Sequence, residues 1–350
     1  MPSDILTAAI DDLASGRDLD RDRATAVLSE IMSGNASEAQ IAAVLIALRT
    51  KGETADEIAG LATAMRRMAV PVKTSRTDLV DTAGTGGGRT TFNVSTTAAF
   101  VAAGAGCAVA KHGNRSATAL SGSADVLEAL GARIDLDAEA VGRCIDEVGF
   151  GFMFAPAHHA ATRWVVPVRK ALAVRTIFNF LGPLTNPAGA RRQVIGVSDP
   201  GFLDVLAEAV ARLGADRALL VSSADGLDEL SISAPTTVVE VNGEEIRRYE
   251  VAPADVGLPE GPPDAGAGGT PEENAAVARA VLAGEQGPRA DLVALNAGAA
   301  IYAAGKVDDL RAGVEAAREA IASGAAAKAL EDFVAATRRL APEPAPEGAG

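Results

Sequence analysis

A glycine-rich run between residues 81 and 96 carries the residue types best suited to chemistry in this 350-residue chain. Glycines stand at positions 84, 86, 87 and 88, after an apolar stretch and before a helical pattern. Glycine lets the backbone turn tightly and bring its N–H groups to an anion, and the start of a following helix adds unpaired N–H groups and partial positive charge. The run indicates a phosphate cradle, although an ordinary glycine-rich surface loop explains it about equally well when it is taken alone.

Two familiar nucleotide-binding motifs do not fit this run. A Walker A loop counted from Gly84 requires Gly-Lys where this chain has Arg89-Thr90. The dinucleotide fingerprint requires a third glycine where Arg89 or Thr91 stands, depending on the register. The phosphate that binds here is therefore held in neither the ATP nor the NAD geometry of those motifs.

A second polar cluster, Lys111 to Arg115, follows a short apolar stretch that ends at Ala110. It brings two cations, an imidazole and an amide to the end of a predicted strand, the edge at which open α/β sheets bind ligands. The segment from Ser121 to Gly131 then places hydroxyl groups and a glycine before a helix. By the same logic it predicts a second anion site.

Six segments of the chain recur in the order and with the spacing of one known family. They are Gly84–Gly87, Asn93–Thr96, Lys111–Arg115, Ser121–Gly131, Arg175–Pro187 and Asp225–Glu229. The chain resembles the anthranilate phosphoribosyltransferases, enzymes of the tryptophan pathway whose class has a nucleoside-phosphorylase-like fold, and the similarity extends from the N-terminal helices to Phe333. Six ordered motifs are far more specific than a single glycine loop.

The resemblance implies an enzyme that moves the phosphoribosyl group of phosphoribosyl pyrophosphate to the amino group of anthranilate, giving N-(5-phosphoribosyl)anthranilate and pyrophosphate. Positive charge develops at the ribose carbon and negative charge on the leaving group, so catalysis needs charge stabilisation and positioning more than a strong base. Lys111 is expected to neutralise leaving-group charge. The donor residues that the resemblance implies are Gly84, Thr85, Gly86, Gly87, Asn93, Ser95, Thr96, Lys111 and Ser123.

The resemblance also implies Mg²⁺ as cofactor, with Asp228 and Glu229 as its ligands and Ser95 as a further candidate. Magnesium prefers oxygen ligands and commonly bridges carboxylates to phosphate oxygens. Adjacent acidic residues in an acidic protein usually form only a solvated turn. The assignment of this pair as metal ligands therefore depends on the other motifs.

For anthranilate, the resemblance implies contacts from Gly84, Asn114, His159, Arg169, Gly182 and Pro183. Arg169 can bind a carboxylate through two parallel hydrogen bonds, and Gly182-Pro183 is expected to form a flat wall for the ring. No catalytic residue is assigned with certainty, and Lys111 and His112 are the candidates. His112 and His159 can shape the pocket or handle the amine proton, but a lone histidine is more often structural, and the aniline nitrogen is already nucleophilic.

Three places depart from the family pattern. The family usually has Asp-Gly after Gly-Thr-Gly-Gly, whereas this chain has Gly88-Arg89 and a loop one residue shorter before Asn93. Leu120 stands where the family often has a basic residue, and Ser222-Ser223 stands where it often has His-Gly. A usual acidic contact is therefore missing, and these changes can alter donor binding.

Composition restricts the partners. The net charge of −14 opposes sequence-independent nucleic-acid binding, which needs a basic surface, although Lys111, Arg115 and Arg169 can still form a local basic pocket. No apolar run is long enough to cross a bilayer, and the N-terminus lacks the pattern of a signal peptide. The 2 cysteines, Cys107 and Cys144, indicate free buried thiols rather than a disulfide framework. We expect a cytoplasmic enzyme that binds neither nucleic acid nor a membrane.

The elements that must position these residues follow from periodicity and punctuation. Up to Val70 the pattern is helical, with capping boxes at Ser37-x-x-Gln40 and Thr54-x-x-Glu57, and Pro71 ends this bundle. The segment from Phe152 to Leu172 also has a helical pattern that looks continuous with the bundle. Predicted strands lie around 79–80 and at 108–110, 193–197, 218–222 and 238–241, with helices at 97–103, 138–148 and 202–213.

This alternation predicts an α/β fold in which a small helical bundle accompanies a larger α/β domain with a mostly parallel central sheet flanked by helices. The helical domain is expected at residues 1–70, joined by helices within 160–187, and the phosphoribosyl pyrophosphate-binding domain at 71–340. Residues 252–271, rich in proline and glycine, are predicted to form a loop, and residues 341–350 a disordered tail.

Two other functions remain open on the sequence. A pyrimidine nucleoside phosphorylase shares the fold, but its phosphate loop and basic motif differ, and Leu184-Thr185-Asn186-Pro187 favours the transferase. A non-catalytic relative that binds nucleic acid is the second alternative, and the net charge opposes it. A homodimer formed through the helical domain rests on the resemblance alone.

Overall fold

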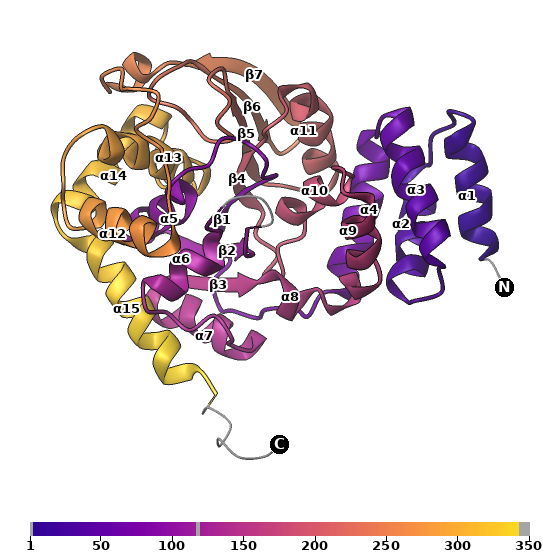
Figure 1. The fold of residues 1–350 in the computed structure, drawn as a ribbon. Coiled ribbons are helices and arrows are strands. Elements are labelled where there is room, and N and C mark those ends of the chain that lie inside the picture. The colour runs from indigo at the N-terminus through magenta and orange to yellow at the C-terminus, as the bar shows by residue number, and fades with distance from the viewer. Residues whose placement is uncertain (1–2, 117–119, 343–350) are drawn as a thin grey trace.

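The computed structural model describes residues 3–116 and 120–342. An N-terminal bundle of helices stands beside a larger body in which helices cover both faces of a seven-stranded sheet (Figure 1). The predicted fold class, a helical bundle with a mostly parallel α/β domain, is confirmed. Across the described residues, no helix combines the length and apolar character needed to span a membrane.

The bundle contains α1 (Asp4–Ala14), α2 (Arg21–Met32), α3 (Glu38–Lys51) and α4 (Ala55–Met68). Both predicted capping boxes form: Ser37 with Gln40 at the start of α3, and Thr54 with Glu57 at the start of α4. Each box satisfies N–H groups that the first helical turn leaves without partners. The apolar faces of these helices meet in one buried cluster that also includes Val165, Val168 and Phe178 from a much later segment.

That later segment consists of short helices that pack against the bundle. They are α8 (Ala155–His158), η1 (Ala160–Trp164), α9 (Val166–Leu172), α10 (Phe178–Leu181) and η2 (Gly182–Leu184). Helix α9 contacts α3, and α10 contacts α4, as Figure 1 shows. The chain thus returns to the bundle after it has built part of the sheet.

The sheet has the strand order β3-β2-β1-β4-β5-β6-β7. Its strands are β1 (Leu79–Gly84), β2 (Ala108–Gly113), β3 (Phe150–Phe154), β4 (Arg192–Gly196), β5 (Arg217–Ser223), β6 (Thr236–Asn242) and β7 (Glu245–Val251). Strands β1 to β5 pair in parallel, and β6 and β7 add an antiparallel edge. The carboxyl ends of β1, β2, β4 and β5 therefore lie along one edge of the sheet.

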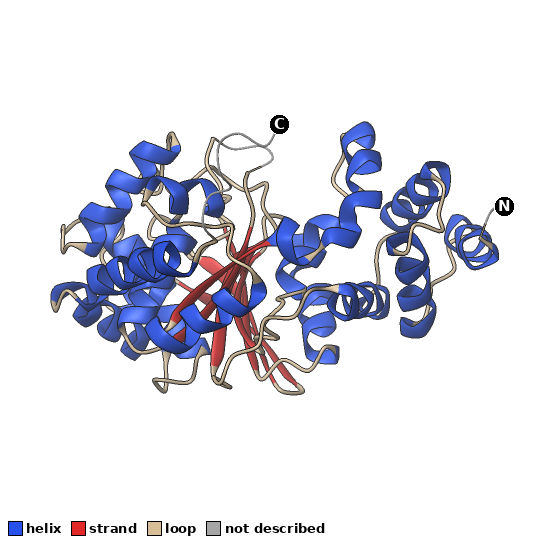
Figure 2. Ribbon diagram, turned by 90° about the horizontal axis from the view of Figure 1, so that it is seen from below, coloured by secondary structure: helices blue, strands red, loops and turns tan. Residues whose placement is uncertain are grey.

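Both faces of the sheet are buried. Since alternate residues of a strand point to opposite sides, each strand contributes to two cores. Along β5, Leu219 and Val221 join the core under the C-terminal helices, whereas Ala218 and Leu220 join the core that includes the bundle. Figure 2 shows the strands enclosed by helices. The remaining helices are α5 (Val94–Gly104), α6 (Ser123–Ala129), α7 (Ala138–Val148), η3 (Pro200–Phe202), α11 (Leu203–Arg212), η4 (Pro253–Val256), α12 (Pro271–Leu282), α13 (Pro288–Ala303), α14 (Leu310–Ala322) and α15 (Ala325–Leu340).

The prediction of a continuous helical pattern from Phe152 to Leu172 is wrong at its start. Phe152 and Met153 lie in β3, a buried strand that pairs in parallel with β2. A short apolar run has no periodicity that separates a strand from a buried helix, and here the neighbouring strand decides. The antiparallel strand β7 was also not predicted.

The predicted domain boundaries at residues 70 and 71 stay predictions. The first residues of the predicted tail, Ala341 and Pro342, follow the end of α15, and residues 343–350 lie outside the described part of the chain.

Candidate active site

The glycine-rich loop joins the end of β1 to the start of α5, as the sequence predicts. Gly86 and Gly87 have φ values of +64° and +87°, which glycine adopts far more readily than other residues. The Gly86 carbonyl oxygen accepts hydrogen bonds from Arg175 Nη1 at 2.6 Å and from Ser198 Oγ at 2.9 Å. Because the N–H and C=O of a trans peptide point in opposite directions, the Gly87 N–H faces away from these two side chains.

The predicted metal ligands come together below this loop. Ser95, Asp228 and Glu229 line one small cavity with Thr82. The Ser95 N–H donates to Glu229 Oε1 at 3.0 Å, whereas Glu229 Oε2 is buried and has no hydrogen-bond partner among the described residues. Burial and the neighbouring Asp228 carboxylate raise the pKa of Glu229 to about 8. A buried carboxyl group with one unpartnered oxygen fits a cation, which would favour its charged form.

These residues suit Mg²⁺ in particular. In the described part of the chain, no three His, Cys, Asp or Glu side chains form a cluster that could hold a metal by themselves. Magnesium is commonly held by one or two carboxylates together with substrate phosphates. Asp228 and Glu229 beside a phosphate cradle match that arrangement, and their role as ligands stays a prediction.

Lys111 lies fully inside the protein at the same edge of the sheet, with 1% of its surface exposed. Its Nζ donates to the Thr82 carbonyl at 2.5 Å and to Thr82 Oγ1 at 3.2 Å. Burial lowers the pKa of Lys111 to about 8, and Asp81 and Glu229 oppose this shift. In this conformation the cation stabilises the end of β1, so its predicted contact with the leaving group requires the ammonium group to exchange partners.

His112 and His159 form the next part of the site, with ring centroids 5.1 Å apart. The Gly182 carbonyl lies 3.1 Å from His112 Nδ1, which must carry the proton to donate to it, and His112 Nε2 is left buried without a partner among the described residues. Burial lowers the pKa of His112 to about 3 and that of His159 to about 4. Both rings are therefore neutral at physiological pH. His112 can accept a hydrogen bond through Nε2, but it is a weak proton acceptor.

Arg169 belongs to α9, in the segment that returns to the bundle. Its guanidinium lies 5.5 Å from the centre of the Phe178 ring and makes no hydrogen bond or ion pair to any residue from 3 to 116 or from 120 to 342. It is half-buried, and burial lowers the pKa of this group. A half-buried cation without a counter-ion is the feature expected of a binding site for a carboxylate.

The predicted donor residues at the start of α5 are already engaged. Asn93 has the left-handed φ of +64°, and its Oδ1 accepts from Ser121 Oγ and Asn274 Nδ2, each at 2.9 Å. Thr96 Oγ1 donates to Ser123 Oγ at 3.1 Å. These contacts bring the predicted donor residues Asn93, Thr96 and Ser123 together, and Thr85 is held beside Ser198 at the start of the glycine loop.

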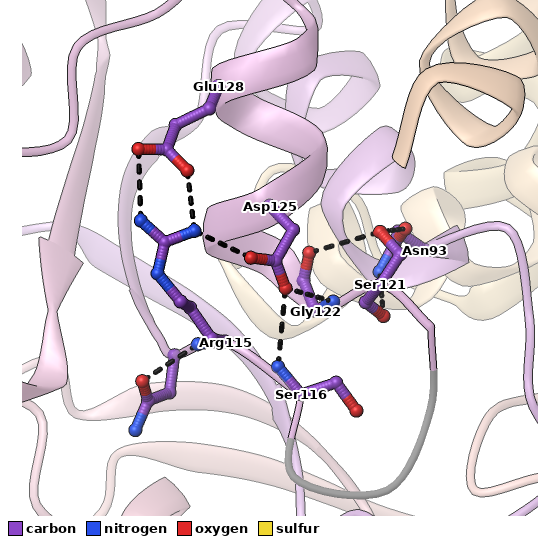
Figure 3. Close-up of polar contacts among 8 residues, drawn as sticks. Asn93, Arg115, Ser116, Ser121, Gly122, Asp125 and Glu128 are labelled. Carbon is purple, nitrogen blue, oxygen red and sulfur yellow. Dashed lines mark hydrogen bonds and ion pairs between the residues drawn. The ribbon is translucent and has the colours of Figure 1, made fainter. Parts of the chain in front are cut away.

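The second anion site predicted at Ser121 to Gly131 does not agree with the structure. Figure 3 shows the Asp125 carboxylate at the start of α6, where Oδ2 accepts from the Gly122 N–H at 2.8 Å. Negative charge thus already occupies this helix start. Arg115 is likewise not a free cation of a basic pocket, because its exposed guanidinium is paired with Asp125 and Glu128, each at 2.6 Å.

The other predicted residues lie close by or at the margin. The Gly84 Cα lies against Asp228. Gly182 and Pro183 pack beside His112 and Gln193. Asn114 is exposed directly after β2. Of the departures from the family pattern, Leu120 is 70% exposed, whereas Ser222 and Ser223 are buried at the end of β5. Leu120 therefore packs little against the described residues.

Three residues that position the site were missed. Asp81 is fully buried and accepts from the His112 N–H at 3.1 Å and from Asn186 Nδ2 at 2.8 Å, and Thr82 holds Lys111. Arg175 holds the glycine loop through the Gly86 carbonyl. A signal existed for each, since Asp81 and Thr82 open the glycine-rich run and Arg175 opens a family motif, but their partners are distant in sequence.

Comparison with known proteins shows the family of this chain. The helical bundle domain of a glycosyl transferase family matches residues 7–69, and the a/b domain of the same family matches residues 76–327. An anthranilate phosphoribosyltransferase from Symbiobacterium thermophilum is 53% identical over 97% of this chain and 100% of its own length. The chain belongs to the anthranilate phosphoribosyltransferase family.

Further members of the anthranilate phosphoribosyltransferase family show the same likeness. The enzyme from Rubrobacter xylanophilus is 52% identical over 96% of this chain and 99% of its own length. The crystal structure of the Thermus thermophilus enzyme has a TM-score of 0.90 at 49% identity, covering 94% of this chain and 99% of that one. The Saccharomyces cerevisiae enzyme in complex with PRPP and Mg has a TM-score of 0.87 at 29% identity, covering 96% and 98%.

Proposed function

We propose that this chain transfers the phosphoribosyl group of phosphoribosyl pyrophosphate to the amino group of anthranilate and releases pyrophosphate, in tryptophan biosynthesis. Membership of the anthranilate phosphoribosyltransferase family supports the reaction, and a yeast relative was solved with PRPP and Mg and another time with 4-fluoroanthranilate. The reaction places the enzyme among the glycosyltransferases that transfer a pentosyl group.

The observation that carries the proposal is a pair of site groups without partners, a buried carboxyl group and a half-buried guanidinium. The buried Glu229 Oε2 lacks a partner, and the half-buried Arg169 lacks a counter-ion, among the described residues. A Mg²⁺-bound diphosphate would supply the cation to the carboxyl groups, and an aromatic acid would supply the anion to the arginine. The two substrates of this reaction would therefore provide a partner for each group.

The donor half of the site acts through charge. Bound Mg²⁺ would offset negative charge on the diphosphate while Asp228 and Glu229 hold it. The Gly87 N–H is fixed in direction because Arg175 and Ser198 hold the Gly86 carbonyl of the same peptide group. Preorganised donors of this kind stabilise charge that develops in the transition state without a cost of reorganisation at that moment.

The acceptor half acts through orientation. Arg169 would bind the anthranilate carboxylate, and the wall formed by Gly182 and Pro183 would support the ring. The neutral His112 can accept a hydrogen bond from the amine at Nε2, and Gly182 keeps the ring in the tautomer that allows it. Since the pKa of His112 is lowered to about 3, this histidine orients the nucleophile rather than storing its proton.

The test is a fluorescence assay with purified protein, Mg²⁺, phosphoribosyl pyrophosphate and anthranilate. We expect anthranilate fluorescence to be lost only when all three small molecules are present. The double variant Asp228→Asn with Glu229→Gln is expected to lose Mg²⁺-dependent turnover. Phosphorolysis of thymidine or uridine without loss of anthranilate would instead identify a pyrimidine nucleoside phosphorylase, and tight binding of single-stranded DNA in a gel shift at low salt would favour the nucleic-acid-binding alternative.

Two properties complete the proposal. The family resemblance supports a homodimer formed through the helical domain, for which light scattering on the eluted protein should give twice the mass of the 35.3 kDa chain. We also propose a cytoplasmic location, to be tested by fractionation of the source cells. A monomeric mass or a membrane-bound protein would contradict these two statements without affecting the assigned reaction.

A further inference from the structure

The glycine loop and the loop that carries the predicted metal ligands are joined at Gly88 and Arg89, where this chain departs from its family. The Arg89 N–H donates to the Gly226 carbonyl at 3.2 Å. The aliphatic part of the Arg89 side chain lies over Gly226, whose φ of +87° leaves that face of the turn open. Two loops separated by more than a hundred residues thus share a backbone contact next to the site.

The Arg89 guanidinium extends this contact to a third segment. Nη2 donates to the Pro263 carbonyl at 2.9 Å, and Nη1 lies 3.4 Å from the Asp225 carbonyl and 3.5 Å from Asp225 Oδ2. Pro263 belongs to the loop that precedes α12. One side chain therefore links the glycine loop to both loops that face it.

Asp225 is itself held firmly. Its carboxylate accepts from Ser231 Oγ at 2.8 Å, from Ser233 Oγ at 2.5 Å and from the Leu227 N–H at 3.3 Å. The side chain is 13% exposed. Arg89 thus connects the glycine loop to a rigid turn that begins three residues before Asp228, rather than to a mobile surface carboxylate.

Position 88 has no room for a side chain. A Cβ atom on Gly88 would lie 2.5 Å from Asp228 Oδ1 and 3.2 Å from the Asp228 backbone nitrogen. An aspartate here would also bring a second negative charge against Asp228. Gly88 and Arg89 therefore act as a matched pair: glycine permits the close approach of the loops, and arginine maintains it.

We propose that Arg89 is a positioning residue of the donor site, which holds the glycine loop against the turn carrying Asp228 and Glu229 so that the diphosphate and its Mg²⁺ meet both at once. This inference rests on the proposed function. It assigns no substrate contact to Arg89.

The experiment compares Arg89→Ala and Arg89→Lys with the wild type. We expect Arg89→Ala to raise the KM for phosphoribosyl pyrophosphate and the Mg²⁺ concentration for half-maximal rate by about 5- to 20-fold, the effect of losing one partly exposed set of charge-assisted hydrogen bonds. The KM for anthranilate should stay within about twofold of the wild-type value, as expected for a site that the substitution does not touch. Arg89→Lys should recover part of the loss, because an ammonium group can reach one of the acceptors but not all of them.

A second comparison separates positioning from direct contact with phosphate. Asp225→Asn removes the charge that Arg89 faces. If both residues act through the same tether, the rise in the KM for phosphoribosyl pyrophosphate in the double variant Asp225→Asn with Arg89→Ala should be clearly less than the two single effects combined. Additive effects would show that Arg89 acts on the substrate by itself and would overturn the proposal. The matched control is Arg143→Ala, which removes an exposed guanidinium paired with Glu147 on α7 and should leave all constants unchanged.

The outcomes distinguish this proposal from the proposed function. A wild-type protein that does not consume anthranilate refutes the function. An active wild type whose Arg89→Ala variant keeps the wild-type KM for phosphoribosyl pyrophosphate and the same Mg²⁺ dependence refutes the tether alone. Thermal unfolding of each variant confirms that the comparison is made between folded proteins.

Discussion

Replacing Arg169 by alanine tests the acceptor half of the site in isolation. In the described parts of the chain its guanidinium has no hydrogen bond or ion pair and only stacks over Phe178 at 5.5 Å. The free energy of unfolding should therefore fall by no more than about 1–2 kcal/mol, the contribution of a partly buried cation–π contact. Substrate binding should change much more.

The size of the effect follows from the bond that is lost. Hydrogen bonds to charged groups contribute about 1.5–3 kcal/mol, and about 1.4 kcal/mol corresponds to a factor of ten. We expect Arg169→Ala to raise the KM for anthranilate about 10- to 100-fold at an unchanged KM for phosphoribosyl pyrophosphate. Arg169→Lys should lie between the two, because lysine keeps the charge but loses the two parallel hydrogen bonds.

The assay is the loss of anthranilate fluorescence over a range of anthranilate concentrations with the donor saturating. Arg163→Ala is the control: Arg163 lies on the same segment, but its guanidinium stacks on the exposed Trp164 at 5.0 Å. It should behave like the wild type. If Arg169→Ala keeps the wild-type KM for anthranilate, or if both substrates are affected equally, then the assignment of the carboxylate to Arg169 is incorrect.

Three further predictions concern the buried groups of the site. Burial raises the pKa of Glu229 from its ordinary 4.5 to about 8, so the free energy of unfolding of the metal-free protein should fall as pH rises across that interval. Glu229→Gln should reduce this fall. Urea unfolding in EDTA at about pH 6 and about pH 8.5 measures the fall, and an equal fall in both proteins would contradict the prediction. Gly196→Ala should lower the free energy of unfolding by about 1–3 kcal/mol in the same measurement, since a Cβ at position 196 would lie 1.8 Å from the Asp228 carbonyl oxygen. A variant as stable as the wild type would disprove this steric argument. The pH profile of kcat/KM should show no step near the ordinary histidine pKa of 6.5, because the pKa of His112 is lowered to about 3. A step at that pH that disappears in His112→Asn would instead identify His112 as a general base.

Much of the local structure follows from neighbouring residues. The capping boxes at Ser37 and Thr54 begin α3 and α4 where the sequence predicts, and α7 spans the predicted residues 138–148. The glycine loop lies between a strand and a helix, as expected. These features depend on interactions within a few residues, so a single sequence contains the information that decides them.

The strand β3 shows where such reasoning fails. Phe150 to Phe154 forms a strand because β2 lies beside it and offers a parallel ladder of hydrogen-bond partners. The helix start at Gly122 was misjudged for the opposite reason, because the overlooked partner is local. Its N–H group is satisfied by Asp125 of the same helix.

Residue types and their order along the chain indicated the glycine cradle, and the family resemblance carried by the ordered motifs implied the adjacent carboxylates and the arginine for an aromatic acid. The folded arrangement was needed to show which of these charges are left unsatisfied: Lys111 is held by Thr82 and Arg115 by Asp125, whereas Glu229 Oε2 and Arg169 lack partners within residues 3–116 and 120–342. The tether of Arg89 also appears only in the fold, because its partners Asp225 and Pro263 are more than a hundred residues away. The physical reason is that charge, unlike helix or turn propensity, acquires its effect from whatever the fold brings within a few ångströms.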